Sequence, residues 1–262
     1  MEDHPSAPET HPNRRKLLQL AVLGGVIGAA YGGTALLRRL TEPDLAFEPI
    51  PDLPGFRWIE GGPISGGATA LAVLRPHDGG DEVSVRLSNA AICTALFGPA
   101  PDPARVQIAY FTDYRCFYCR TVSPMLAALE KEGGVQITWH ELPLLGQISD
   151  IAARAALAAR EQGAYDIFHK RLMGAQAVPN PPYLRQLAQE ASIDGARLLR
   201  DMNSRPVLSQ IMLSFALAKR FGFIGTPAMV IGRTAVMGGI DRRMLDRLID
   251  AEQRADTPAT CP

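Results

Sequence analysis

Two cysteines separated by two residues, Cys116 and Cys119, constrain this chain more than any other feature. They follow residues 106–111, an apolar run typical of a buried strand, and they precede a segment with helical periodicity. The first turn of a helix leaves backbone N–H groups unpaired and carries the positive end of the helix dipole, which favours a thiolate on Cys116. Because the thiolate is the species that attacks disulfides, this pattern predicts a redox-active disulfide.

Composition narrows the class of protein without identifying it. The chain has 262 residues, of which 47% are apolar, so it can form one large domain with appendages or two small domains. Lys and Arg number 27, as do Asp and Glu, and this zero net charge argues against a nucleic-acid partner. Four cysteines are too few for a disulfide-stapled miniprotein, although they allow two pairs.

The N-terminal part of the chain predicts a disordered tail followed by a membrane segment. Residues 1–16 are polar and rich in Pro and His. Residues 17–37 contain no charged side chain and would span roughly 30 Å as a helix, which is enough to cross a bilayer. We expect a transmembrane anchor or an uncleaved signal here, and a buried core helix is the less favoured alternative. The pair Arg14-Arg15 also partly matches a twin-arginine export signal.

Residues 38–103 are interpreted as a Pro-rich linker and a small N-terminal extension. The prolines near its start favour a semi-stiff spacer that holds a domain away from the membrane. Alternating and apolar runs on either side of turn residues suggest a hairpin over residues 70–87. A short helix is expected from Asn89 to Phe97, where Gly98 follows.

The two remaining cysteines are far apart in the sequence. Cys93 stands in an apolar context and could simply be a small buried side chain. Cys261 is the second residue from the end, within the C-terminal tail of residues 253–262. An exposed free thiol is a liability in an exported protein, so a structural Cys93–Cys261 disulfide is one possibility, although pairing cannot be deduced from sequence.

The periodicity around and after the cysteine pair predicts an α/β domain. A strand over 106–111, a helix ending at Gly133 and a strand over 136–140 form a βαβ unit, so the two strands should be parallel. A block of helices follows, the first with Ser149 as its N-cap. The remaining expected elements are helices over 165–173, 182–191, 195–202 and 206–220, strands over 228–231 and 235–237, and a helix from Asp241 to about 252.

Two stretches of this chain resemble the DsbA family of thioredoxin-fold proteins. They are residues 111–120, FTDYRCFYCR, and residues 225–232, GTPAMVIG. The resemblance covers roughly residues 104–252 and implies a thioredoxin-like α/β fold with an inserted all-helical domain at about 149–222. It also implies that Pro227 is cis and lies against the cysteine pair, and that the Thr226 backbone receives an extended substrate as an added strand.

The resemblance implies thiol–disulfide exchange, with Cys116 as the nucleophile and Cys119 as the resolving thiol. Phe117 and Tyr118 lie between them and would contribute to substrate binding. DsbA itself typically has Pro and His at these positions, so this pair should be less oxidising, and a Tyr at the second position resembles isomerases and glutaredoxins. Oxidase, isomerase and reductase therefore all remain open, in that order of preference.

The resemblance also implies location and partners, and no cofactor. We expect the catalytic domain in the periplasm, anchored to the bacterial inner membrane by residues 17–37. Secretion to the periplasm after signal cleavage is the alternative. The expected partners are exported cysteine-containing proteins and a membrane redox protein that resets the cysteine pair.

Several side chains near the cysteine pair could tune its chemistry, but for each of them a position without a chemical role is favoured. Solvated positions are expected for Asp113, Arg115 and Arg120, and a surface position for His140. Packing roles with one polar group are expected for Tyr110, Tyr114 and Trp139.

Two hypotheses from other classes of protein compete with the hypothesis of a redox enzyme. A structural zinc site would use Cys116 and Cys119, but it needs two further ligands, and no second pair with metal-binding spacing occurs. We therefore predict no metal. The other alternative is a membrane-tethered binding module whose disulfide is only structural.

Overall fold

The computed structural model describes residues 44–66, 89–175, 178–255 and 261. The chain divides into two units, residues 1–46 and 47–262, and all that follows concerns the second. The expected tail, membrane segment and 70–87 hairpin lie outside the described residues. Within the described part, no helix has both the length and the apolar character that crossing a bilayer requires.

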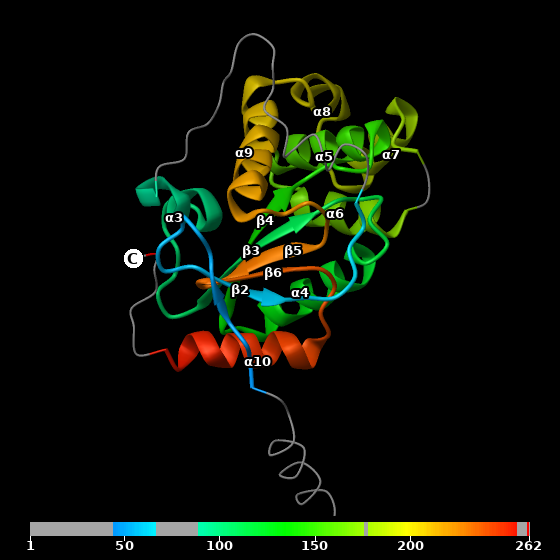
Figure 1. Cartoon of the computed structure of the whole chain (residues 1–262). Helices are drawn as coiled ribbons and strands as arrows, with labels where there is room; N and C mark the ends of the chain where they lie inside the picture. Colours follow the sequence, from blue (N-terminus) through cyan, green and yellow to red (C-terminus); the bar gives the residue numbers. More distant parts are fainter. Residues whose placement is uncertain (1–43, 67–88, 176–177, 256–260, 262) are drawn as a thin grey trace, which may run out of the picture. The chain divides into compact units, whose positions relative to one another are not determined.

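A six-stranded mixed sheet forms the centre of this unit (Figure 1). Its strands lie side by side in the order β1-β2-β6-β5-β3-β4. The strand bounds are β1 Glu48–Pro49, β2 Arg57–Glu60, β3 Val106–Thr112, β4 Val135–Glu141, β5 Ala228–Ile231 and β6 Thr234–Met237.

Strand β3 ends at the cysteine pair and is buried on both faces from Ile108 to Thr112. It runs parallel to β4 and antiparallel to β5, so the expected parallel βαβ unit is confirmed. Strands β5 and β6 form an antiparallel hairpin through Gly232, whose φ of 54° lies in the left-handed region where glycine is favoured. A sheet covered on both faces explains the continuous apolar runs in these strands.

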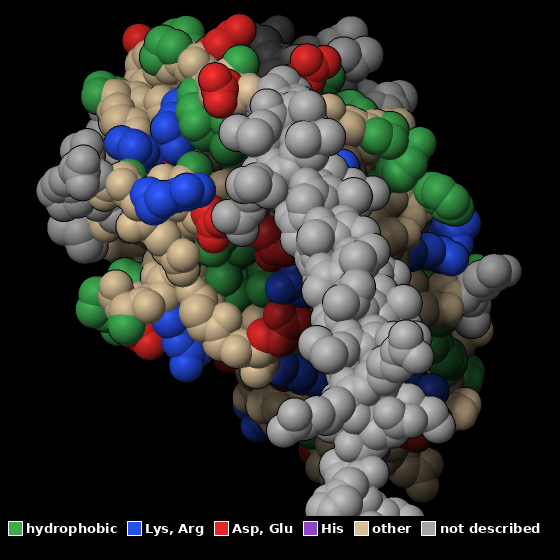
Figure 2. All heavy atoms as spheres, turned by 90° about the horizontal axis from the view of Figure 1, so that it is seen from below, with side chains coloured by type: hydrophobic (Ala, Val, Ile, Leu, Met, Phe, Trp, Pro, Cys, Tyr) green, Lys and Arg blue, Asp and Glu red, His purple; other side chains and the backbone are tan. Residues whose placement is uncertain are grey.

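Eight helices surround the sheet in the described part of the chain. Their bounds are α3 Asn89–Phe97, α4 Cys119–Glu132, α5 Gln147–Arg160, α6 Tyr165–Gly174, α7 Pro181–Glu190, α8 Gly195–Asp201, α9 Arg205–Phe221 and α10 Arg242–Gln253. Helix α10 lies below the sheet and α9 above it in Figure 1. Seen from below, the visible described side chains include basic and acidic groups in several separate places (Figure 2).

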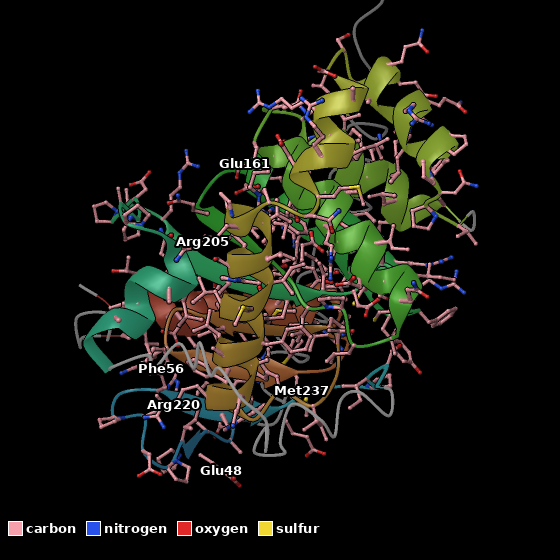
Figure 3. The ribbon with its side chains drawn as sticks, turned by 90° about the horizontal axis from the view of Figure 1, so that it is seen from above. Glu48, Phe56, Glu161, Arg205, Arg220 and Met237 are labelled. Atoms are coloured by element: carbon pink, nitrogen blue, oxygen red, sulfur yellow. A yellow bond between two sulfur atoms is a disulfide. The ribbon has the colours of Figure 1, made fainter. Side chains whose placement is uncertain are left out.

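Helices α3 and α9 pack on one face of the sheet. Ile92 and Leu96 of α3, Leu217 of α9 and Phe111 of β3 share one buried apolar cluster. Figure 3 shows Phe56 beside the C-terminal end of α9, where its ring meets that of Phe221 edge-on at 5.1 Å. Burying these large side chains is the main favourable contribution to packing on this face.

The helices α5 to α9 follow β4 and precede β5 in the sequence. Their buried side chains form a second apolar cluster. The alanines of α5 leave room for close approach of neighbouring helices, and Phe168 of α6 and Leu187 of α7 fill the centre. Cys116 and Cys119 belong to this same cluster. The cysteine pair therefore lies where the sheet and the helical block meet.

Four helices begin at a side-chain cap, and of the two caps that the sequence predicted, Asp241 is confirmed and Ser149 is not. The side chains of Asn180, Asp194, Ser204 and Asp241 cap α7, α8, α9 and α10. The expectation that Ser149 caps α5 was wrong, because α5 begins at Gln147 and Ser149 lies inside it. The Ser149 hydroxyl donates to the Asp113 carboxylate instead.

The sequence analysis missed strands β1 and β2. Residues 57–60 pair in parallel with β6, so the segment interpreted as a linker and extension adds two strands to the sheet. Nearby prolines and the shortness of these strands hide the alternation that signals a strand. Beyond β2 the chain continues over the end of β6 toward the cysteine pair.

The surface position expected for His140 was also wrong. His140 is buried on β4, where its ring stacks on Phe111 with centroids 4.7 Å apart. Its Nε2 atom lies 2.9 Å from the Leu96 carbonyl oxygen of α3. Burial lowers the pKa of His140 to about 4, so the ring is neutral and its N–H can donate to that carbonyl.

Candidate active site

Cys116 lies in the loop between β3 and α4, and Cys119 is the first residue of α4. The Cys119 backbone N–H donates to Cys116 Sγ at 3.1 Å, which is the unpaired helix N–H that the sequence pattern predicted. The Cys116 thiol in turn donates to the Thr226 carbonyl oxygen at 3.3 Å. Both cysteines are free thiols, so the structure shows the reduced form of the pair.

The two thiols have different acidities. A hydrogen bond from the Cys119 side chain, with smaller contributions from Thr226 and Ser65, lowers the pKa of Cys116 to about 6 despite its burial. Burial and the neighbouring Cys116 sulfur raise the pKa of Cys119 well above its ordinary value. Cys116 is therefore the sulfur that ionises near neutral pH, while Cys119 holds its proton.

Thr226 and Pro227 face the cysteine pair and are joined by a cis peptide bond. Among the described residues, the buried Thr226 hydroxyl has no hydrogen-bond partner while both cysteines are thiols. It lies near enough to lower the pKa of both sulfurs. A hydroxyl in this position can donate to a thiolate once Cys116 ionises.

Both sulfurs are buried, and the chain itself covers Cys116. Cys116 and Cys119 each have 0% of their surface exposed. Ser65, from the segment after β2, forms an isolated antiparallel bridge with Thr226. The sequence analysis missed Ser65, since the glycines around it indicated only a loop.

Asp113 anchors the loop that carries Cys116, and the expected solvated position for it was wrong. Its carboxylate is buried and accepts hydrogen bonds from the backbone N–H groups of Arg115 at 2.7 Å and Leu145 at 2.9 Å. The Ser149 hydroxyl donates to it at 2.6 Å. Its own backbone oxygen accepts the Cys116 N–H. Asp113 thus ties the cysteine loop to the start of α5.

The other two charged side chains near the pair differ in their environment. Arg115 is exposed, in line with the expected solvated position. Arg120 is half-buried, and its guanidinium donates to the Ala175 carbonyl oxygen at 3.4 Å. Neither contacts a sulfur in any described hydrogen bond or ion pair.

A buried polar cluster adjoins the cysteine loop on the side of the helical block. One Glu141 oxygen accepts hydrogen bonds from the hydroxyls of Tyr114 at 2.8 Å and Tyr165 at 2.6 Å. His169 Nδ1 lies 3.0 Å from the Tyr114 hydroxyl. Tyr114 therefore packs with a satisfied polar group, as expected, and it joins the loop to α6.

Tyr110 and Trp139 also pack beside the pair. The Tyr110 ring meets the Trp139 ring edge-on at 5.4 Å, and its hydroxyl lies 3.3 Å from the Ser123 hydroxyl of α4. Burial raises the pKa of Tyr110 well above its ordinary value, so the phenol remains protonated beside Cys119.

The two residues between the cysteines face outward to different extents. Phe117 has 73% of its surface exposed, which is unusual for a large apolar side chain, whereas Tyr118 is half-buried. Their rings meet edge-on at 5.4 Å. They give the outer surface above the sulfurs an aromatic character.

Cys93 and Cys261 form a disulfide with an S–S distance of 2.00 Å. The bond joins α3 to the C-terminal end of the chain across 168 residues. Both residues pack partly buried against the cluster under α3 and α9. The disulfide therefore packs against a different buried cluster from the one that contains the free cysteine pair.

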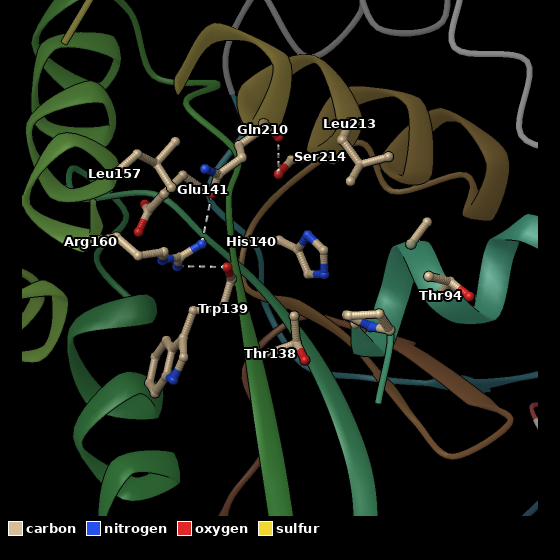
Figure 4. A pocket seen from close by; sticks show the side chains of 13 residues that line it. Thr94, Thr138, Trp139, His140, Glu141, Leu157, Arg160, Gln210, Leu213 and Ser214 are labelled. Carbon is tan, nitrogen blue, oxygen red and sulfur yellow. Dashed lines mark hydrogen bonds between the residues drawn. The ribbon is translucent and has the colours of Figure 1, made fainter. Parts of the chain in front are cut away.

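A cavity of about 340 Å³ lies between α3, β4, α5 and α9 (Figure 4). Neither free cysteine lines it. The Arg160 guanidinium donates to Gln210 at 3.0 Å and to the Trp139 carbonyl oxygen at 3.1 Å, as the dashed lines show. The Arg160 guanidinium at this cavity therefore already donates hydrogen bonds to acceptors of the protein. In the described ranges, no three His, Cys, Asp or Glu side chains are grouped so as to hold a metal ion.

Comparison with known proteins points to one family. The family model described as the DSBA-like thioredoxin domain matches residues 107–250. A thioredoxin-like oxidoreductase from Silicibacter pomeroyi DSS-3 has a solved structure that is similar with a TM-score of 0.57 and 36% sequence identity, over 62% of this chain and 98% of that one.

Two curated proteins give further similarities. The probable disulfide bond formation protein D of Bacillus anthracis is 24% identical over 165 residues, which is 58% of this chain and 75% of that protein. The Na(+)/H(+) antiporter NhaA 3 of Salinispora tropica is 28% identical over 134 residues, which is 50% of this chain. The matching region makes up only 21% of the antiporter's length.

Proposed function

Because this chain belongs to the DsbA-like thioredoxin domain family, we propose that it is a thiol–disulfide oxidoreductase that oxidises exported proteins. The observation that carries the proposal is the unequal acidity of Cys116 and Cys119 at the start of α4. One sulfur ionises near neutral pH and the other stays protonated within reach of it. This is the arrangement that a nucleophile and a resolving thiol require.

The oxidase reaction balances over two exchange steps. A substrate thiolate attacks Cys116 Sγ in the oxidised pair, the Cys116–Cys119 bond breaks, and Cys119 takes up a proton. A second substrate thiolate then attacks the substrate sulfur of the mixed disulfide, and Cys116 leaves as a thiolate. The substrate loses two electrons and two protons in total, and the cysteine pair gains the electrons.

The acidity of Cys116 supports oxidation over reduction. A thiol of low pKa is a good leaving group, and a stabilised thiolate favours the reduced form of the pair, which makes its disulfide an oxidant. The value of about 6 lies between the roughly 7 of thioredoxin and the roughly 3.5 of DsbA. A mild oxidant is therefore the best match, and the similar Bacillus anthracis protein is named as a probable disulfide bond formation protein, which supports oxidation.

The substrates that we propose are extended cysteine-containing segments of exported proteins. Exposed Phe117 and half-buried Tyr118 offer apolar contact beside the pair. Thr226 offers backbone groups for pairing with an extended chain. The domain that would do this spans about 104–252 and includes the helical insertion at about 149–222.

The proposed location, and the proposed partner that reoxidises the cysteine pair, are argued from the sequence. We propose that residues 17–37 anchor the domain on the periplasmic side of the bacterial inner membrane, since this run carries no charge and is long enough to span. A membrane redox protein would then reoxidise the pair. Membrane extraction at high pH tests the anchor, because an integral segment stays in the pellet and a peripheral protein does not.

The function is tested by oxidative refolding of a reduced, unfolded substrate with the oxidised protein. Formation of substrate disulfides at a stoichiometric loss of the Cys116–Cys119 bond supports the oxidase. Rapid repair of a scrambled substrate without net oxidation indicates an isomerase instead, and rapid insulin reduction indicates a reductase. A protein that is inert in all three assays, with its pair shown to be oxidisable, is the tethered binding module.

The variant Cys119→Ser identifies the nucleophile. It should hold substrates on Cys116 as mixed disulfides, because no resolving thiol remains. The matched variant Cys116→Ser should be inactive and should trap nothing. If Cys116→Ser traps substrates as well as Cys119→Ser does, the assigned roles are wrong.

A further inference from the structure

The segment Gly61–Ser65, which we name the strap, runs from the end of β2 to the cysteine pair. Ser65 donates its N–H to the Thr226 carbonyl oxygen at 2.8 Å and accepts the Thr226 N–H at 3.0 Å. The Pro63 carbonyl oxygen accepts the Gly239 N–H at 2.9 Å. The strap is therefore held as an added antiparallel strand against the loop that faces Cys116.

Glycines on the facing segments let the strap approach this closely. A Cβ atom built on Gly225 would lie 2.7 Å from Ile64 Cδ1, and one on Gly238 would lie 1.9 Å from the Gly62 carbonyl oxygen. A Cβ on Gly62 itself would lie 2.1 Å from the Gly239 carbonyl oxygen. A side chain at Gly62 or Gly238 would clash with backbone atoms, so these two segments are in backbone-to-backbone contact, whereas Gly225 leaves room for the Ile64 side chain.

The strap also covers the reactive sulfur. Cys116 has no exposed surface, and it lies between Thr226, Cys119 and the Ser65 side chain. A substrate sulfur must contact Cys116 Sγ directly to exchange with it. It cannot do so while the strap is paired with Thr226 and Cys116 is fully buried.

We infer that the strap is a built-in occupant of the substrate position, with Ser65 standing where a substrate cysteine would react, and that an extended cysteine-containing peptide must displace it. Serine has the shape of cysteine and cannot form a disulfide, so the occupant is held only by hydrogen bonds. This inference rests on the proposed function, because it assumes that Thr226 pairs with substrates. It adds that the resting enzyme is self-blocked and that its apparent affinity for peptides is reduced by the fraction of open molecules.

Kinetics with a short peptide dithiol test the displacement. Ser65→Pro and Ser65→Ala both remove the hydroxyl that helps to lower the pKa of Cys116, and only Ser65→Pro also removes the N–H that donates to Thr226. Relative to Ser65→Ala, we expect the KM of Ser65→Pro for the peptide to fall on the order of fivefold, the factor for one hydrogen bond, with the same kcat in both variants. Ser65→Ala keeps both backbone hydrogen bonds, so its KM should stay near the wild-type value. An unchanged or higher KM for Ser65→Pro, in a protein that melts like the wild type, overturns the inference.

Amide hydrogen exchange supplies a second test that needs no strap variant. In full-length Cys119→Ser carrying a peptide trapped on Cys116, the Ser65 amide should exchange much faster than in the free protein. The Thr226 amide should stay protected, because the peptide replaces the strap as its partner. Protection of Ser65 that survives trapping means that substrates bind elsewhere, and the inference fails while the exchange chemistry stands. A protein that traps no peptide at all contradicts the proposed function itself.

Discussion

Thr226 shows how one side chain can set the chemistry of Cys116. Its carbonyl oxygen accepts the Cys116 thiol, while its buried hydroxyl has no partner in the described structure until a sulfur ionises. The Thr226 carbonyl oxygen stabilises the thiol form of Cys116, and the Thr226 hydroxyl stabilises the thiolate form. The thiolate gains more, because hydrogen bonds to charged groups are about twice as strong as neutral ones.

Thr226→Val should therefore raise the pKa of Cys116 from about 6 toward the ordinary value of about 8.5. The change removes the hydroxyl and keeps the side-chain shape. The measurement is the midpoint of the pH profile for alkylation of the reduced protein by a small reagent. Thr121→Val makes the same change at an exposed position of α4 and should leave the midpoint in place. A Thr226→Val midpoint equal to that of the wild type contradicts this role.

At the scale of single elements, Asp113 joins the end of β3 to the start of α5. Three donors from Arg115, Leu145 and Ser149 converge on its buried carboxylate. These bonds fix the loop in which Cys116 stands. The sulfur therefore owes its position to the helical block as well as to the sheet.

Asp113→Ala should destabilise the protein by about 2–4 kcal/mol, because it leaves three buried or partly buried donors without an acceptor. Urea unfolding followed by circular dichroism measures the change. Asp102→Ala removes a half-exposed carboxylate and should cost about 0.5 kcal/mol or less. Equal effects of the two substitutions would show that Asp113 does not anchor the loop.

His140 makes the contact between α3 and the sheet sensitive to pH. Its folded pKa of about 4 lies below the roughly 6.5 of the unfolded chain, so the unfolded state binds more protons between these values. Stability should fall as the pH falls from about 6.5 to about 4, by up to about 3 kcal/mol from this residue. His140→Phe keeps a ring against Phe111 and should flatten the unfolding free energy over this range. A variant with the wild-type pH dependence would assign the loss of stability to other groups.

At the scale of the whole molecule, the disulfide ties the C-terminal end of the chain to α3. It encloses 168 residues, so it restricts the unfolded chain strongly. The double variant Cys93→Ser/Cys261→Ser should lose about 2–5 kcal/mol of stability and keep its exchange activity, since neither sulfur contacts the free pair. Thermal unfolding and the refolding assay measure the two effects. A loss of exchange activity in a still-folded double variant would mean that the bond acts on the active site.

The sequence predicts strands β3 to β6 and the helical block well because their patterns are local. The strand before Cys116, the parallel partner around Trp139 and the helix that begins after Asp241 follow from periodicity and capping chemistry. The reactive pair is likewise marked by its own spacing. Each of these features can be predicted from residues that are neighbours in the sequence.

The errors share a different cause, which is contact between distant segments. Asp113 and His140 are buried by helices that pack from elsewhere in the chain, and no local pattern reveals that. Ser65 reaches Thr226 across 161 positions through two backbone hydrogen bonds that carry no side-chain signature. Backbone pairing is available to almost any sequence, so the covering of Cys116 could only be found in the structure.

The most direct measurement is the ultraviolet absorbance of the Cys116 thiolate as a function of pH, in reduced protein with the Cys93–Cys261 bond intact. Absorbance does not require a reagent to enter the covered site. A single transition near pH 6 that disappears in Cys116→Ser is the result that this account predicts. A transition at the ordinary value of about 8.5 or above would contradict it, because Cys116 would then be no more nucleophilic at neutral pH than a free cysteine.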